Sequence, residues 1–96
     1  LLAEAGMVVV ALTVDKTTGS VVAGPEIASR GFVYMKESDG LMDEVKQAVR
    51  TALAARQEPE VIDRELIGAV VRSAVRRFIN QRFDRKPVVI PLVLEV

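Results

Sequence analysis

Residues 7–14 read Met-Val-Val-Val-Ala-Leu-Thr-Val, a continuous and mostly β-branched run. Such side chains favour extended backbone, and a run of this length fits a strand that is covered on both faces, or nearly so. Residues 15–20, Asp-Lys-Thr-Thr-Gly-Ser, follow with turn-forming side chains, and Gly19 can adopt a positive φ. We therefore expect the chain to turn back after residue 14 and form an antiparallel hairpin.

The second arm of this hairpin is expected to be interrupted. A strand pattern resumes at residues 20–23, breaks at Gly24-Pro25, and continues at residues 32–35, Phe-Val-Tyr-Met. Proline cannot donate a ladder hydrogen bond, so the break predicts a bulge, a bend or an edge position. Gly31 is interpreted as a residue with positive φ or in a bulge. The alternative interpretation of this segment gives Arg30 a contact with a ligand or partner.

Two amphipathic helices are predicted between the hairpin and the C-terminus. Ser38 or Asp39 can cap the first, Asp63 can cap the second, and the break between them is Glu58-Pro59-Glu60. Apolar residues at helical spacing define the buried stripe of each helix. These are Leu41, Val45, Ala48, Val49, Ala52 and Leu53 in the first helix, and Leu66, Val70, Val71, Ala74, Phe78 and Ile79 in the second. Gly68 inside the second stripe indicates either close packing or simple tolerance of glycine.

The remaining residues complete an α/β chain of the α+β, two-layer type. Pro87 ends the helical region, and residues 88–96, Val-Val-Ile-Pro-Leu-Val-Leu-Glu-Val, are predicted as a last strand in which Pro91 indicates an edge or a bulge. Each helix has one apolar stripe and needs a sheet to bury it. We expect a three-stranded sheet with two helices on one face, in the order β-β-α-α-β, within a single domain of residues 1–96. The strand order stays open.

Composition narrows the range of functions. The 96 residues carry a formal net charge of zero and include neither cysteine nor histidine. A Ser-His-Asp or Cys-His catalytic arrangement is therefore excluded, and no cofactor or metal site is expected in the chain. No apolar run approaches the roughly 20 residues of a membrane helix. A cytoplasmic origin fits, with no membrane partner. The first residues, Leu-Leu-Ala-Glu-Ala-Gly, are interpreted as the start of a piece cut from a longer protein.

Charge is distributed unevenly along the chain. Asp39, Asp43 and Glu44 lie at the start of the first predicted helix. Such a cluster could hold a hard cation, but the favoured interpretation is a set of favourable charges at the positive end of the helix. The stretch from residue 64 to 86 is basic instead: it holds Arg64, Arg72, Arg76, Arg77, Arg82, Arg85 and Lys86 against Glu65 and Asp84. A basic helix face can contact phosphates, although a solvated outer face is the simpler interpretation. The candidate residues for contact with RNA or a partner are Arg30, Arg72, Arg76 and Arg77.

Residues 29–35, Ser-Arg-Gly-Phe-Val-Tyr-Met, carry a family resemblance together with the first hairpin, the helical pair and the basic stretch leading to the last strand. In combination these features resemble the C-terminal domain of ribonuclease J, a bacterial ribonuclease of the metallo-β-lactamase type with a β-CASP domain. The resemblance covers nearly the whole chain. It implies a parent enzyme that processes and degrades RNA as a 5′-exonuclease and endonuclease, with zinc bound in a catalytic core outside these residues.

The same resemblance implies an accessory role for the chain. It would be the C-terminal domain that supports subunit association and full activity, and would not itself be a nuclease. The implied partners are the parent catalytic core, further copies in a homodimer or tetramer, and RNA through the parent enzyme.

Two hypotheses from different classes remain open. An assembly domain would pair subunits through an aliphatic surface or an exposed edge, with the final strand as the favoured participant, or through the helix face bearing Arg72 and Arg76. An RNA-binding module would use that same helix face. Salt dependence distinguishes phosphate contacts from aliphatic association, because only the former weaken steeply with salt.

Overall fold

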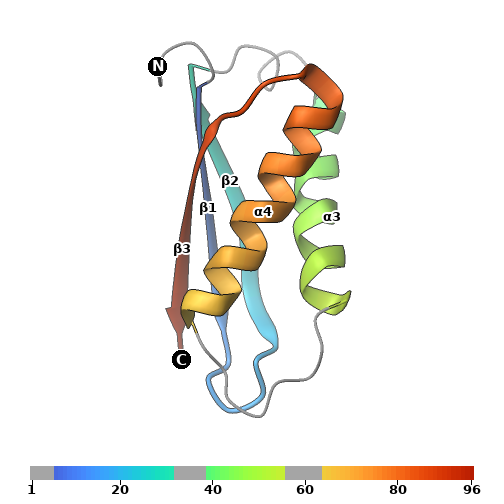
Figure 1. Ribbon diagram of the computed structural model, residues 1–96. Coiled ribbons are helices and arrows are strands. Elements are labelled where there is room, and N and C mark those ends of the chain that lie inside the picture. The colour runs from blue at the N-terminus through green and yellow to red at the C-terminus, as the bar shows by residue number, and fades with distance from the viewer. Residues whose placement is uncertain (1–5, 32–38, 56–63) are drawn as a thin grey trace.

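Two layers make up the computed structural model, which describes residues 6–31, 39–55 and 64–96. The strands β1 (Met7–Val14), β2 (Val21–Arg30) and β3 (Val88–Glu95) form one sheet, and the helices α3 (Asp39–Ala55) and α4 (Arg64–Phe83) lie together on one of its faces (Figure 1). The predicted element order and two-layer α+β architecture are confirmed. The predicted strand at residues 32–35 and the caps at Ser38 and Asp63 lie outside the described residues.

The strand order is β2-β1-β3, with β1 antiparallel to β2 and parallel to β3. Both strands that contain proline are therefore edge strands, as Pro25 and Pro91 predicted. The ladder between β1 and β2 shifts register between Ala11 and Val14, which confirms the bulge among the predicted alternatives. The predicted break of the strand at Gly24-Pro25 is wrong, because β2 continues through both residues to Arg30. At Gly24 the φ angle is +87°, and a Cβ atom there would lie 2.7 Å from the carbonyl oxygen of Ala11, so this position requires glycine.

The hydrophobic core lies between the sheet and the helices. Along β1, Val8, Val10, Leu12 and Val14 are almost fully buried, whereas Met7, Val9, Ala11 and Thr13 on the other face are only half-buried. The expectation that this strand is covered on both faces is therefore wrong. The physical reason is that both helices cover the same face, and no described element lies on the other.

The buried stripe of α4 differs from the predicted one. Two neighbouring rows of apolar side chains, each with four-residue spacing, run along this helix. The predicted stripe combined residues from both rows. The row Ile67, Val71, Val75 and Ile79 is fully buried in the core, although Ile67 and Val75 were not predicted. In the other row Val70, Ala74 and Phe78 are half-buried, and Leu66 is 43% exposed. Both rows are apolar, so their spacing alone does not tell which of them meets the sheet.

The stripe of α3 agrees better with prediction, and a surface contact ties it to α4. Leu41, Val45 and Val49 are buried, while Ala48, Ala52 and Leu53 are half-buried. The Arg82 guanidinium of α4 donates a hydrogen bond to the Glu44 carboxylate and lies 5.1 Å from the centre of the Phe78 ring. Glu44 therefore has a partner on α4 besides its favourable place near a helix start. Both charged side chains are about half exposed, so we expect a small contribution to stability.

Candidate functional site

The four predicted contact arginines do not meet at one place. Arg72 and Arg76 are exposed one turn apart on α4. Arg77 is also exposed, but it borders the crevice between α4 and Ala52 of α3. Arg30 ends β2 on the opposite layer of the molecule. Its side chain lies on the sheet face away from the helices, because strand residues alternate and Pro25 and Ile27 face the core. The structure therefore pairs two of the four arginines and separates the others.

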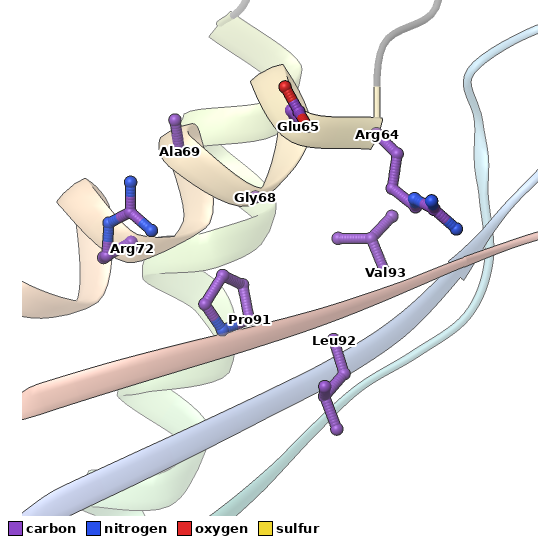
Figure 2. Close-up of a pocket in the computed structure, with 8 residues that line it drawn as sticks. All are labelled: Arg64, Glu65, Gly68, Ala69, Arg72, Pro91, Leu92 and Val93. Carbon is purple, nitrogen blue, oxygen red and sulfur yellow. The ribbon is translucent and has the colours of Figure 1, made fainter.

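A shallow groove of about 620 Å³ lies between α4 and β3, as Figure 2 shows. It is lined by Arg64, Glu65, Gly68, Ala69 and Arg72 of α4 and by Pro91, Leu92 and Val93 of β3, although the Leu92 side chain points away from α4 (Figure 2). Gly68 is buried against Pro91, and an added Cβ atom would lie 3.4 Å from the Pro91 Cγ atom. The structure therefore combines the two interpretations of Gly68: α4 packs against β3 at this position, but an added Cβ atom would make only an ordinary contact, so glycine is tolerated and not required.

Arginines stand at the two ends of this groove. Arg72 lies beside Pro91, and Arg64 lies beside Val93 (Figure 2). The floor between them is made of small and apolar residues, and the carboxylate of Glu65 also lines the groove, so the positive charge is partly balanced at the Arg64 end. Sequence reasoning placed Arg64 in the basic stretch but not among the contact residues. The eight-residue spacing of Arg64 and Arg72, about two helical turns, was the available signal.

A second candidate surface is the sheet face that the helices leave uncovered. We call it the open sheet face and define it by Met7, Val9, Ala11, Thr13, Ala23, Glu26, Ala28, Arg30, Val88, Ile90, Leu92 and Leu94. On β3 its side chains are well exposed, at 38% for Ile90, 50% for Leu92 and 61% for Leu94. Its charges, Glu26 and Arg30, both come from β2. The open sheet face is thus apolar over β1 and β3 and charged along one side.

The free edge of β3 is a third candidate surface, where a strand of a partner could pair, but Pro91 makes such pairing less favourable. The Val88 N–H donates to the Gly6 carbonyl and the Val96 N–H donates to the Val14 carbonyl, with an N–O distance of 3.0 Å in each case. Both N–H groups therefore point toward β1. Peptide groups alternate along a strand, and the groups of residues 89, 91, 93 and 95 therefore point to the free edge. Pro91 has no N–H to offer there. This missing donor disfavours the predicted pairing of the final strand with a partner's sheet.

Polar side chains in the described part of the chain lie at its surface. The described residues contain no buried polar or charged side chain and no group of three His, Cys, Asp or Glu residues that could hold a metal ion. The chain as a whole has neither histidine nor cysteine. Its residues therefore do not fit the zinc site that the resemblance implies for the parent enzyme. Among the described helices, none is long and apolar enough to cross a membrane.

Known proteins resemble this chain along its full length. The family model described as "Ribonuclease J C-terminal domain" matches residues 1–96. The chain is 35% identical over 96 residues to "Ribonuclease J2" of Bacillus subtilis (strain 168), with 100% of the chain and 17% of that protein covered. It is 34% identical over 93 residues to "Ribonuclease J 1" of Streptococcus pyogenes serotype M3, with 97% of the chain and 17% of the relative covered. The chain thus spans about a sixth of the length of these relatives.

Proposed function

The chain belongs to the ribonuclease J C-terminal domain family, and from this premise we propose that it is the accessory domain of a ribonuclease J-type enzyme. In this role it supports subunit association and full activity of a catalytic core that lies elsewhere in the parent protein. The parent enzyme would process and degrade RNA as a zinc-dependent exonuclease and endonuclease. Its cytoplasmic location stays a prediction.

The observation that carries this proposal is the open sheet face. Three large aliphatic side chains, Ile90, Leu92 and Leu94, are exposed side by side on β3, next to the half-buried Val9 and Ala11 of β1. Contiguous apolar surface of this kind is characteristic of protein interaction sites, because burying it releases about 25 cal/mol per Å². Burial of these aliphatic side chains would be insensitive to salt, unlike contact through the basic flank of α4.

A charge introduced into the open sheet face tests the proposal. Leu92→Lys in the parent enzyme should weaken subunit association and lower the rate of RNA degradation, because a lysine would have to be buried at the interface. Leu66→Lys is the matched control: Leu66 is 43% exposed, close to the 50% of Leu92, but lies on α4 away from the sheet. Sedimentation equilibrium and degradation of a labelled RNA are the measurements. Wild-type assembly and activity in Leu92→Lys would contradict the proposal.

The isolated chain should have no nuclease activity of its own. It lacks histidine and cysteine, and its described residues hold no convergent acidic cluster. The purified chain is incubated with labelled RNA and zinc, magnesium or manganese. Metal-dependent cleavage that persists through successive purification steps would overturn the accessory role.

RNA contact along α4 is a second candidate function, favoured by one specific arrangement. Arg64 and Arg72 stand at the ends of the same groove, and Arg76 follows one turn beyond Arg72. Three guanidinium groups along one flank match the repeating negative charge of a nucleic acid backbone.

The salt dependence of RNA binding tests this second function. For the double variant Arg72→Ala with Arg76→Ala, the slope of log affinity against log salt should fall by about 0.7 for each lost contact with single-stranded RNA. Arg77→Ala is the matched control, because Arg77 borders the crevice with α3 instead. An unchanged slope and affinity in the double variant would eliminate this function.

A further inference from the structure

Four rows of side chains cross the open sheet face, and their order is set by the strand registers. Three consecutive rows include its two charges, and the fourth, which holds Ala23, Thr13 and Leu94, lies beyond the third. The first row holds Arg30, Met7 and Val88, the second holds Ala28, Val9 and Ile90, and the third holds Glu26, Ala11 and Leu92. The middle row is uncharged. The two outer rows carry opposite charges, both on β2, at equal distances from Ala28.

From this arrangement we infer that the partner of the open sheet face is the same face of a second copy, packed about a two-fold axis. The axis lies between the two sheets, perpendicular to the strands, at the level of the middle row. Rotation about it places β2 on β2 of the partner, running in the opposite direction. Glu26 then lies opposite Arg30 of the partner subunit, and Arg30 lies opposite the partner's Glu26. One symmetry operation thus satisfies four charges with two ion pairs.

The apolar part of the face follows the same symmetry. Leu92 lies opposite the partner's Val88, and Ala11 lies opposite the partner's Met7, so in each case the smaller side chain meets the larger. The other symmetric choice, a two-fold axis parallel to the strands, would place β2 on β3 of the partner. Glu26 and Arg30 would then lie against aliphatic side chains without an opposite charge, which is costly. The charges therefore select one axis direction.

The inferred contact is small. Three strands of about eight residues project an area of roughly 400 Å² per copy, against roughly 800 Å² for each partner in a standard interface. The isolated chain should therefore dimerise weakly, at concentrations of tens to hundreds of micromolar. In the parent enzyme, other subunit contacts would raise the effective concentration of the two faces. The inference rests on the proposed function, because it names the partner of the same surface.

Reversing the charges tests the two-fold axis directly. Glu26→Arg alone and Arg30→Glu alone each place like charges opposite one another, and each should raise the dimer dissociation constant at least about tenfold, because the two-fold axis turns both ion pairs into like-charge contacts. The double variant, Glu26→Arg with Arg30→Glu, restores both ion pairs and should return to within about threefold of the wild type. Sedimentation equilibrium of the chain and of the parent enzyme measures this. Both side chains are exposed, so the variants should fold, and circular dichroism verifies it.

Two outcomes separate this inference from the proposed function. If Leu92→Lys weakens association but the double charge reversal does not recover what the single reversals lose, the copies meet through the open sheet face in another arrangement, and the two-fold axis is wrong. If neither Leu92→Lys nor the single reversals weaken association, the proposed function fails as well.

A cross-linking measurement gives an independent test, because the chain has no native cysteine. Ala28 lies on the inferred axis, so Ala28→Cys should be joined to its partner copy by a short bifunctional maleimide. Ser73→Cys is exposed on the helix layer and should not be. Equal cross-linking of the two variants would overturn the inference.

Discussion

The two faces of the sheet differ although they share the same central strand. On one face of β1, Val8, Val10 and Leu12 are at most 2% exposed, because α3 and α4 cover them. On the other face Val9 and Ala11, their immediate neighbours, are only half-buried. Both sets are apolar and alternate along one run of sequence. The comparison teaches that an apolar strand pattern identifies side chains suited to burial but does not say what covers them. In the described fold the helices cover one face of β1 and leave the other face uncovered.

The largest expected effect follows from removing a side chain on the covered face. Leu12→Ala should lower the free energy of unfolding by about 2–5 kcal/mol, because Leu12 is 2% exposed and its loss leaves a cavity. Leu92→Ala on the open sheet face should cost less than about 1 kcal/mol in the monomer, since half of this side chain is already in water. Urea denaturation of both variants measures the difference. Equal losses would mean that the two faces are not distinct in the folded chain.

A smaller effect sharpens the same comparison within α4. Ile79 is fully buried, whereas its neighbour Phe78 is half-buried and carries Arg82 over its ring. Ile79→Ala should cost about 2–5 kcal/mol. Phe78→Ala should lower the free energy of unfolding by less than the roughly 3–5 kcal/mol expected for a fully buried phenylalanine. Leu53→Ala should likewise lower it by less than the roughly 2–5 kcal/mol expected for a fully buried leucine. The predicted stripes treated Phe78 and Leu53 as core residues; the structure packs both against the core from its margin. A larger loss for Phe78→Ala than for Ile79→Ala would reverse this assignment.

The smallest expected effect concerns the contact between the layers at Gly68. Gly68→Ala should raise the free energy of unfolding by up to about 1 kcal/mol, because alanine favours the helix interior and the added Cβ atom meets Pro91 at 3.4 Å, an ordinary contact distance. Thermal denaturation measures the change. Gly40→Ala in the first turn of α3, where a Cβ atom meets nothing within 4 Å, reports the helix propensity alone. If Gly68→Ala clearly loses stability while Gly40→Ala does not, the prediction is wrong. The added Cβ atom would then clash with Pro91 because α4 cannot move away from β3.

Local patterns predicted much of the fold for identifiable reasons. Both prolines in strands indicated an edge or a bulge, because a regular strand in the centre of a sheet needs every ladder donor, and both strands are edges. Gly19 and Gly31 have φ angles of 79° and 74°, as their places beside turns and bulges predicted. Less of the candidate site was predictable. Arg72 and Arg76 share a flank because helical spacing requires it, but Arg64 joined them only through the groove with β3.

By itself the sequence determined the types of the described elements, their order, the irregularity of the β1–β2 ladder near Gly24 and the lack of imidazole and thiol groups. These depend on backbone preferences, side-chain spacing and composition, which act between residues close in the chain. Only the tertiary structure decided that β3 runs parallel to β1, that the row through Ile67 and Val75 meets the sheet, and that Glu26 and Arg30 share rows with Leu92 and Val88. Those outcomes depend on contacts between residues far apart in the chain. Several arrangements satisfy the same local pattern, and the packing of the two layers selects one of them.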